Sequence, residues 1–221
     1  MRSSTGRCPT MLLALHLILS VCAPAVAGLR PPAPQPRQLR SIVYEGDMAG
    51  LLAKLAQEFH TNIGLETTPG RPKISVKINL EGDLTLRDVV DAVVRSAQGY
   101  QWREIDGAVE VSPVRGGCPL LDATVDNFQV GDVSQAEAVD HLINLPEVRA
   151  GMAALNLRYG EHSGPPSRAA GEKFSMSLKG ATVRQVLHQI AVKSGGRFWS
   201  LRRHGGRLDG EVITISTPGR W

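Results

Sequence analysis

The sequence predicts an α+β fold made of two tandem small β-α-β-β-α-β-β modules, each with two helices packed on small sheets. Three observations lead to this prediction. Apolar and polar residues alternate strictly in short runs, which is typical of strands with one buried face. Between these runs, apolar residues recur at helical spacing after residues that favour helix N-termini. Finally, one predicted helix and the segment that follows it occur twice, as "TLRDVVDAVVRSAQGYQW" at 85–102 and "TVRQVLHQIAVKSGGRFW" at 182–199.

The N-terminus predicts a signal peptide over residues 1–27. Arg2 and Arg7 precede the apolar run "MLLALHLILSVCA", and "AVA" supplies the small residues of a cleavage site. Val21 is too large for the residue before a lipidated cysteine, so we expect cleavage without lipidation. Residues 28–40, "GLRPPAPQPRQLR", form a Pro-rich tether. We therefore expect an exported protein whose folded part begins near residue 41.

Charge and cysteine usage narrow the class of protein further. The chain of 221 residues has 25 basic and 21 acidic residues, and removal of the signal peptide takes away two arginines and no acid. The mature chain is then close to neutral, which with export makes nucleic acid an unsuitable partner. Cys118 is the one cysteine outside the signal peptide, so no internal disulfide can form. No later run is apolar and long enough to predict a transmembrane segment.

The first predicted module covers residues 41–115. "SIVY" at 41–44 is a short β-rich run, and Asp47 follows it as the N-cap of an amphipathic helix. "NIGLE" at 62–66 predicts the next strand, and "ISVKINL" at 74–80 alternates as a half-buried strand does. The apolar face of the helix is formed by Met48, Leu51, Leu52, Leu55, Ala56 and Phe59.

The second helix of this module begins at Thr85 and stops before Gly99. Thr85 is the N-cap, with Asp88 at the third helical position, and glycine tolerates the positive φ of a helix stop. "YQWREI" and "AVEVS" then pair as a hairpin across Asp106-Gly107. The buried stripe of the helix is formed by Leu86, Val89, Val90, Val93 and Ala97.

The second predicted module covers residues 120–218, after the break "SPVRGGCPLLD". "ATVDNFQV" predicts a strand, and Ser134 with Glu137 forms a capping box that opens a helix, which Pro146 ends or kinks. "LNLRY" is the counterpart of the short second strand. Beyond the polar loop at 160–173, "FSMSLKG" alternates, a helix opens at Thr182, and a hairpin with a longer loop ends in "EVITIS".

The run "ISVKINLEGDLTLRDVVDAVVRSAQGYQWREIDGAVEVSP" resembles the secretin and TonB N-terminal short domain (STN). The second copy resembles it mainly over its last part. Members of this family lie at the periplasmic entrance of secretin channels or in the signalling extension of TonB-dependent receptors, so the resemblance implies a periplasmic location. No secretin or TonB barrel domain follows in the chain, and we expect neither a pore nor a receptor. The match is carried by Ile78, Leu80, Thr85, Leu86, Val90, Gly99, Trp102 and Val109 to Val111.

The sequence contains no pattern that predicts catalysis, a metal site or a cofactor. The histidines of the mature chain lack metal-ligand spacing, Cys118 has no nearby histidine that would activate it, and neither a Gly-x-Ser-x-Gly elbow nor a phosphate-binding loop is present. We therefore expect no enzyme. Trp102 and Trp199 occupy equivalent places, and either packing on the hairpin or exposed binding aromatics would explain them.

Two functional hypotheses remain from the sequence. The resemblance implies a protein-protein interaction module whose partner is a secretin, an inner-membrane clamp or an anti-sigma type component. We expect docking by a strand edge or helix face, with Ile42, Val43 and Tyr44 as the preferred edge. The alternative is a cell-wall or anionic-glycan or lipid binder that uses the Arg-rich C-terminal hairpin loop. Its anion-facing residues would be Arg197, Arg202, Arg203, His204 and Arg207. Oligomeric state and the packing of the two modules stay open.

Overall fold

A computed structural model describes residues 38–71, 73–160, 173–205 and 211–216. The predicted signal peptide and most of the tether lie outside these residues. Within them the fold is mixed α+β, as the sequence predicts. The helices of the described part are too short or too polar for any of them to cross a bilayer.

The first copy of the repeat contains its elements in the predicted order. The sequence expectation for the first strand was too short, because pairing with a neighbouring strand extends it at both ends. The elements are β1 (Leu39–Asp47), α1 (Met48–Glu58), β2 (Asn62–Glu66), β3 (Ser75–Leu84), α2 (Leu86–Ser96), β4 (Tyr100–Ile105) and β5 (Ala108–Pro113).

The second copy has the same order with one additional helix. Pro146 ends one helix and opens another at its first turn, because a proline there lacks only an N–H that would have no helical partner. The elements are η1 (Pro119–Asp122), β6 (Thr124–Val133), α3 (Gln135–Ile143), α4 (Pro146–Ala154), β7 (Leu157–Tyr159), β8 (Phe174–Thr182), α5 (Val183–Lys193), β9 (Phe198–His204) and β10 (Glu211–Ser216).

The predicted side-chain caps are present at three helix starts and absent at a fourth. Thr85, Ser134 and Thr182 each form a complete capping box with the residue three positions later. Asp47 is the N-cap residue of α1, as predicted, but its side chain makes no capping hydrogen bond. Instead the backbone N–H of Met48 donates to the carbonyl oxygen of Ile74 at 2.7 Å. The strand pairing of β1 therefore positions the start of α1.

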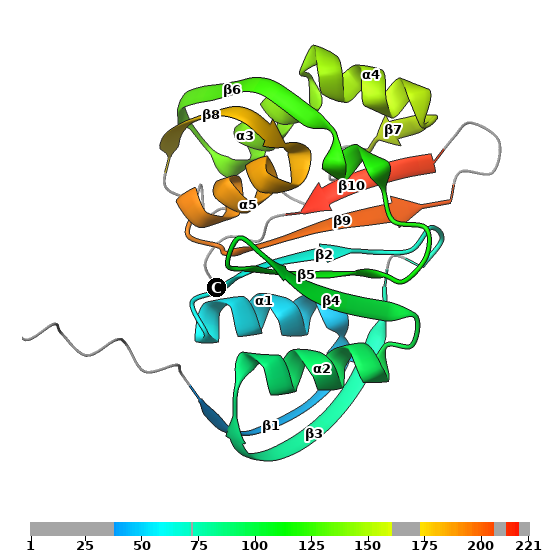
Figure 1. The fold of residues 1–221 in the computed structure, drawn as a ribbon, viewed down its shortest axis with the longest axis vertical. Helices are drawn as coiled ribbons and strands as arrows, with labels where there is room; N and C mark the ends of the chain where they lie inside the picture. Colours follow the sequence, from blue (N-terminus) through cyan, green and yellow to red (C-terminus); the bar gives the residue numbers. More distant parts are fainter. Residues whose placement is uncertain (1–37, 72, 161–172, 206–210, 217–221) are drawn as a thin grey trace, which may run out of the picture. The chain divides into compact units, whose positions relative to one another are not determined.

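The strands of the two copies join in one sheet. In the described residues this sheet has the order β4-β5-β2-β9-β10-β7, and β1-β3 and β6-β8 form separate antiparallel ribbons (Figure 1). The first three strands belong to the first copy and the last three to the second, in equivalent order. The copies meet where β2 pairs in parallel with β9. The joined sheet is thus two equivalent three-stranded sheets placed head to tail.

Each copy places its helices between its own ribbon and the shared sheet. α1 and α2 cover one face together with β1 and β3, and α3 and α5 cover the other face together with β6 and β8 (Figure 1). The junction is covered from both sides, because α1 also packs on β9 and α5 also packs on β2. Each copy therefore has one helix that also packs on a strand of the other copy.

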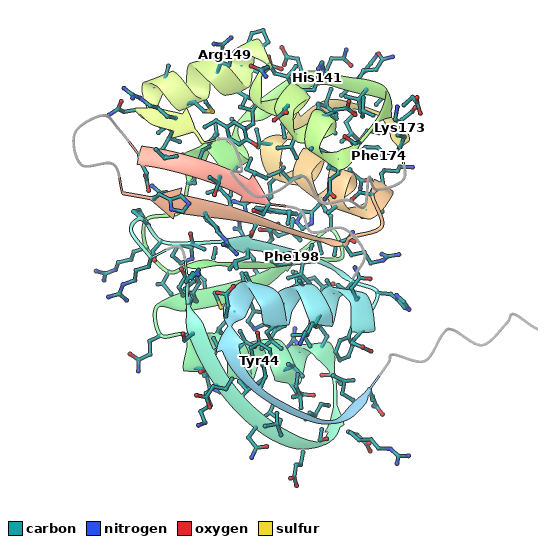
Figure 2. All side chains as sticks on the ribbon, turned by 180° about the vertical axis from the view of Figure 1, so that it is seen from behind. Tyr44, His141, Arg149, Lys173, Phe174 and Phe198 are labelled. Carbon is teal, nitrogen blue, oxygen red and sulfur yellow. The ribbon has the colours of Figure 1, made fainter. Side chains whose placement is uncertain are left out.

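The alternation of β9 divides its side chains between two cores. Phe198 points into the core of the first copy, beside α1 (Figure 2), while Trp199 and Leu201 point into the core of the second copy. Since successive side chains of a strand point to opposite faces, one strand completes both cores. The first core therefore contains a buried phenylalanine supplied by the second copy.

Candidate functional site

The junction between the copies depends on a glycine beneath a tryptophan. Gly64 of β2 lies in register with Trp199 of β9, and the Trp199 side chain is fully buried. A Cβ atom on Gly64 would lie 2.5 Å from Cζ2 of the indole and 2.6 Å from Cε2. Any larger residue at this position would displace a buried indole. Trp199 thus has a packing role.

A buried ionic network lies beside this contact. Glu110 of β5 is in register with Gly64 and has no exposed surface. Its carboxylate accepts a hydrogen bond from Nη1 of Arg184 at 2.6 Å and contacts Nε2 of His188. The His188 ring lies edge-on to Trp199, with 5.4 Å between ring centroids. Groups from both copies therefore neutralise one another under α5, as buried charges require.

Arg184 also binds a second carboxylate. Its Nε and Nη2 donate to Oδ1 of Asp122 at 3.2 and 3.1 Å. Burial alone lowers the pKa of Arg184, but Glu110 and Asp122 outweigh that effect and raise the pKa above its ordinary value. The guanidinium is thus held charged at the junction.

A second buried carboxylate lies at the end of β2. Glu66 is almost fully buried and accepts a hydrogen bond from the backbone N–H of Cys118. Nη1 of Arg203 lies 4.0 Å from Oε1 of Glu66. Burial raises the pKa of Glu66, and the Cys118 N–H and the nearby arginines offset this only in part. Burial also raises the pKa of the Cys118 thiol, which disfavours the reactive thiolate.

The first copy has a strand edge equivalent to the edge of β9 that pairs with β2, but no strand of the described chain pairs with it. β4 is the equivalent of β9 and lies at one end of the sheet. Trp102, the counterpart of Trp199, is half-buried, and its Nε1 donates to Oδ1 of Asp91 at 2.6 Å. The Arg87 guanidinium, counterpart of that of Arg184, lies 5.3 Å from the Trp102 ring centroid.

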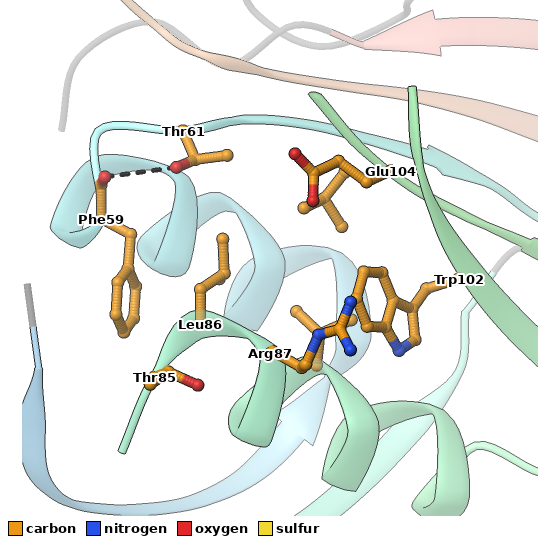
Figure 3. A pocket seen from close by; sticks show the side chains of 9 residues that line it. Phe59, Thr61, Thr85, Leu86, Arg87, Trp102 and Glu104 are labelled. Carbon is orange, nitrogen blue, oxygen red and sulfur yellow. Dashed lines mark hydrogen bonds between the residues drawn. The ribbon is translucent and has the colours of Figure 1, made fainter. Parts of the chain in front are cut away.

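Trp102 and Arg87 line an open pocket of about 330 Å³ (Figure 3). Leu86 contributes partly exposed apolar surface, the lining residues Val90 and Val109 are buried, and Arg87 and Glu104 contribute charges. Among the described residues, neither charge has an ion-pair partner within 4.0 Å. In the second copy the corresponding surface is covered by β2, β5 and η1.

The backbone of β4 is oriented for strand pairing at this edge. The N–H of Val114 donates to the carbonyl oxygen of Gly99 at 2.9 Å, which establishes the phase of the β4-β5 ladder. In an antiparallel ladder every second residue bonds to the neighbouring strand. Gln101 and Arg103 therefore bond to β5, whereas the N–H and C=O groups of Tyr100, Trp102 and Glu104 point away from the sheet.

The predicted docking edge at Ile42, Val43 and Tyr44 lies in the middle of β1, where all three pair with β3. Val43 is 77 % exposed, whereas the other two side chains are partly buried. The Tyr44 hydroxyl donates to the Asp47 carbonyl oxygen at 2.9 Å. Tyr44 thus packs locally, and Val43 is the exposed apolar side chain of this strand that a partner could contact.

Arg202 and Arg203 of the predicted anion-facing patch lie on different faces of the sheet. The expectation that Arg202 and Arg203 lie in a hairpin loop is wrong, because both lie within β9, where neighbouring side chains point to opposite faces. Arg203 forms a two-point ion pair with Glu211 at 3.0 and 2.7 Å. Arg202 lies 3.8 Å from the Asp47 carboxylate.

Arg197 and His204 of that patch each contact another group of the protein. Nη1 of Arg197 donates to the His60 carbonyl oxygen at 3.1 Å, and Nε2 of His204 lies 3.2 Å from Oγ1 of Thr214. Arg207 lies outside the described residues.

Sequence reasoning missed Gly64, Glu110, Arg184 and His188 as a connected group. Glu110 interrupts an otherwise apolar strand, and this was the one local signal available. Its partners lie more than seventy positions away, and spacing carries no information about such contacts. Nowhere in the described ranges do three histidine, cysteine, aspartate or glutamate side chains meet as a metal ion would need.

Comparison of this chain with protein-family models, with curated proteins and with solved structures found no match.

Proposed function

We propose that this chain is an exported, non-enzymatic protein-protein interaction module that docks envelope proteins by strand addition at the free edge of β4. The observation that carries the proposal is the junction between the copies. The edge of β9, which is equivalent to that of β4, binds a parallel strand through residues 63–66. The pairing at β9 thus supports the same use of the β4 edge.

Strand addition supplies both affinity and selectivity in such a site. Backbone hydrogen bonds to the outward groups of Trp102 and Glu104 provide affinity, and side chains that enter the neighbouring pocket provide selectivity. The partly exposed apolar surface of Leu86 and Trp102, beside the charges of Arg87 and Glu104, is suited to an ordered segment with one apolar and one charged contact. Among the described residues no strand is added to β6, the equivalent of β1 in the second copy, so we favour β4 over β1.

The predicted signal peptide and the resemblance to the secretin and TonB short domain support a periplasmic location for this activity. On that basis the partner is a secretin, an inner-membrane clamp or an anti-sigma type component.

A pair of variants at Glu104 tests the docking edge. Glu104→Pro removes an outward N–H, a change that an edge strand tolerates, whereas Glu104→Ala removes the same carboxylate and keeps the N–H. We expect wild type and Glu104→Ala to capture the same protein from envelope extract, and Glu104→Pro to lose it. Circular dichroism establishes that both variants are folded.

Equal capture by both Glu104 variants would exclude the β4 edge. Capture that disappears at high salt with wild type would instead indicate an anionic ligand held by exposed arginines.

A further inference from the structure

We infer that the β4 edge takes an extended segment of a partner protein that runs parallel to β4 and carries a glycine beside Trp102. Two positions after the glycine, the segment carries a lysine or arginine beside Glu104. This inference rests on the proposed function and specifies the chemistry of the segment that the same edge binds. The template is the pairing of β2 with β9, in which residues 63–66 lie in register with residues 198–201.

The outward backbone groups of β4 and β9 are at equivalent positions. The carbonyl oxygens of Arg197 and Leu201 accept hydrogen bonds from N–H groups of the β2 segment, at 2.9 and 3.0 Å. Every second residue of β9 thus directs its backbone groups toward β2, and Trp199 is among them. Trp102 and Glu104, the counterparts of Trp199 and Leu201, direct theirs away from the sheet. A parallel strand at β4 therefore meets donors and acceptors in the phase that β2 meets at β9.

The glycine follows from the equivalent contact in the second copy. Gly64 is in register with Trp199, and a Cβ atom on Gly64 would lie 2.5 Å from Cζ2 of the indole. Trp199 is fully buried in this pairing, whereas Trp102 is half-buried at the open edge. A segment that covers the rest of Trp102 has to bring its backbone as close as that of Gly64. Glycine is the residue that allows such an approach.

The basic residue follows from the one charge that differs between the two edges. Side chains two positions apart on a strand lie on the same face. In the template the residue two positions after the glycine is in register with Leu201, which is buried. Its counterpart Glu104 is exposed, borders the same pocket as Trp102 (Figure 3), and has no ion-pair partner within 4.0 Å among the described residues.

Opposite charges on neighbouring strands attract, and like charges directly opposite each other repel. A lysine or arginine beside Glu104 therefore favours pairing, and an acidic residue there opposes it. β2 itself carries Glu66 at this position. The β4 edge thus selects a segment that resembles β2 at the glycine and differs from β2 in the charge that follows.

The glycine and the basic residue contribute unequally to affinity. A methyl group that overlaps an indole should weaken binding by about tenfold or more. An exposed ion pair changes affinity by roughly two- to fivefold. Glu104→Ala therefore still captures the partner, and the glycine is the stronger determinant of selectivity.

The test uses three synthetic peptides based on residues 61–68, TNIGLETT. The first peptide, TNIGLKTT, has both expected features. TNIALKTT lacks only the glycine, and TNIGLETT lacks only the basic residue. All three are acetylated and amidated, which removes the terminal charges. Each is titrated into the full exported chain labelled with ¹⁵N, and the chemical shifts of the backbone N–H groups give both the binding site and the dissociation constant.

We expect TNIGLKTT to shift the N–H resonances of Trp102 and Glu104 and to bind most tightly. TNIALKTT should bind weaker by about tenfold or more, and TNIGLETT weaker by roughly two- to fivefold. Glu104→Lys should reverse the order of the two glycine peptides, because the charge on the edge is reversed. Trp102→Val, which keeps a residue suited to strands and removes the indole, should bind the alanine peptide as tightly as the glycine peptide.

Three results overturn the inference. They are no binding of TNIGLKTT at β4, equal affinity of wild type for the glycine and alanine peptides, and an unchanged order of the glycine peptides in Glu104→Lys. Circular dichroism establishes that the variants are folded. If Trp102→Val does not fold, the peptides against wild type and Glu104→Lys still decide the outcome.

Failure of this inference is distinguishable from failure of the proposed function. Loss of envelope capture in Glu104→Pro, together with equal binding of the glycine and alanine peptides, would leave the proposed function intact and overturn the inference. Glycine-selective binding at β4, with envelope capture unchanged in Glu104→Pro, would support the inference and exclude this edge as the docking site of the captured protein.

Discussion

At the scale of residues, equivalent positions in the two copies have different roles. Trp199 is buried over Gly64, whereas Trp102 is half-buried beside an open pocket. Arg184 forms a buried ion pair, while Arg87 lies exposed over an indole. The contacts of Trp199 and Arg184 therefore guide the proposal for the surface that Trp102 and Arg87 bind.

Gly64→Ala should destabilise the fold through the contact with Trp199. The new methyl would overlap a rigid, fully buried indole, and overpacking of this kind costs about 1–3 kcal/mol in the free energy of unfolding. Urea unfolding followed by far-UV circular dichroism measures the change. Gly131→Ala is the control, since the nearest atom, Oγ of Ser175, lies 4.0 Å from its Cβ position. Equal stability of the two variants would contradict the predicted overlap.

Glu66 should make stability depend on pH in the weakly acidic range. Its pKa is raised in the folded state by burial, so the folded protein binds this proton more tightly than the unfolded chain does. The contribution of Glu66 to stability is therefore largest below its ordinary pKa and decreases as the pH rises through the raised value.

The comparison that isolates this effect is wild type against Glu66→Gln, since the amide oxygen can still accept the Cys118 N–H. We expect Glu66→Gln to gain stability relative to wild type as the pH rises above the ordinary pKa of a glutamate. Chemical unfolding at a series of pH values measures this difference. A difference between the two proteins that stays constant with pH would refute the role of Glu66.

At the scale of elements, the edges of strands distinguish the hypotheses for docking. β1 has its exposed apolar side chain at Val43, but its closest structural equivalent in the second copy, β6, has no added strand among the described residues. β4 has an equivalent that does bind a strand. We therefore favour the edge of β4 because of the pairing of its equivalent strand, and not the edge of β1 because of the exposed Val43 side chain.

Val43→Lys should leave both folding and capture unchanged. The side chain is 77 % exposed, and substitutions at such positions usually change stability by less than ~0.5 kcal/mol. If docking used the edge at Ile42–Tyr44, as the sequence first indicated, a lysine in its centre would reduce capture of the envelope partner. Pull-down with Val43→Lys and Val43→Ala side by side measures this, and loss with lysine alone would favour β1.

At the scale of the whole folded part, the shared sheet makes the two copies interdependent. Phe198 completes the core of the first copy, and α5 covers β2 of the first copy from the opposite face. We therefore expect one cooperative unfolding transition for residues 38–216, instead of the independent unfolding that two separate modules would show.

Val90→Asp and Leu187→Asp test this interdependence. Both side chains are fully buried, one in each core, and an unpaired carboxylate there costs several kcal/mol or shifts its own pKa. Each variant should increase hydrogen exchange in the strands of both copies, measured by mass spectrometry. Loss of protection confined to the mutated copy would show that the modules unfold separately.

Most secondary structure was predictable because its causes are local. Alternation in "ISVKINL" and "FSMSLKG", and the capping residues Thr85, Ser134 and Thr182, act within a few positions of the chain. Asp47 takes its predicted N-cap position without a side-chain hydrogen bond, because the N–H of Met48 bonds to the carbonyl of Ile74, which is distant in the sequence.

The sequence by itself determined the α+β elements, their order and the existence of two equivalent copies. Only the tertiary structure decided that the copies join through β2 and β9, that Glu110 meets Arg184 and His188, and that Trp102 stays open where Trp199 is covered. The physical reason is that backbone hydrogen bonds between strands are the same for every side chain. Which edges meet therefore depends on the packing of both cores, and no local pattern encodes it.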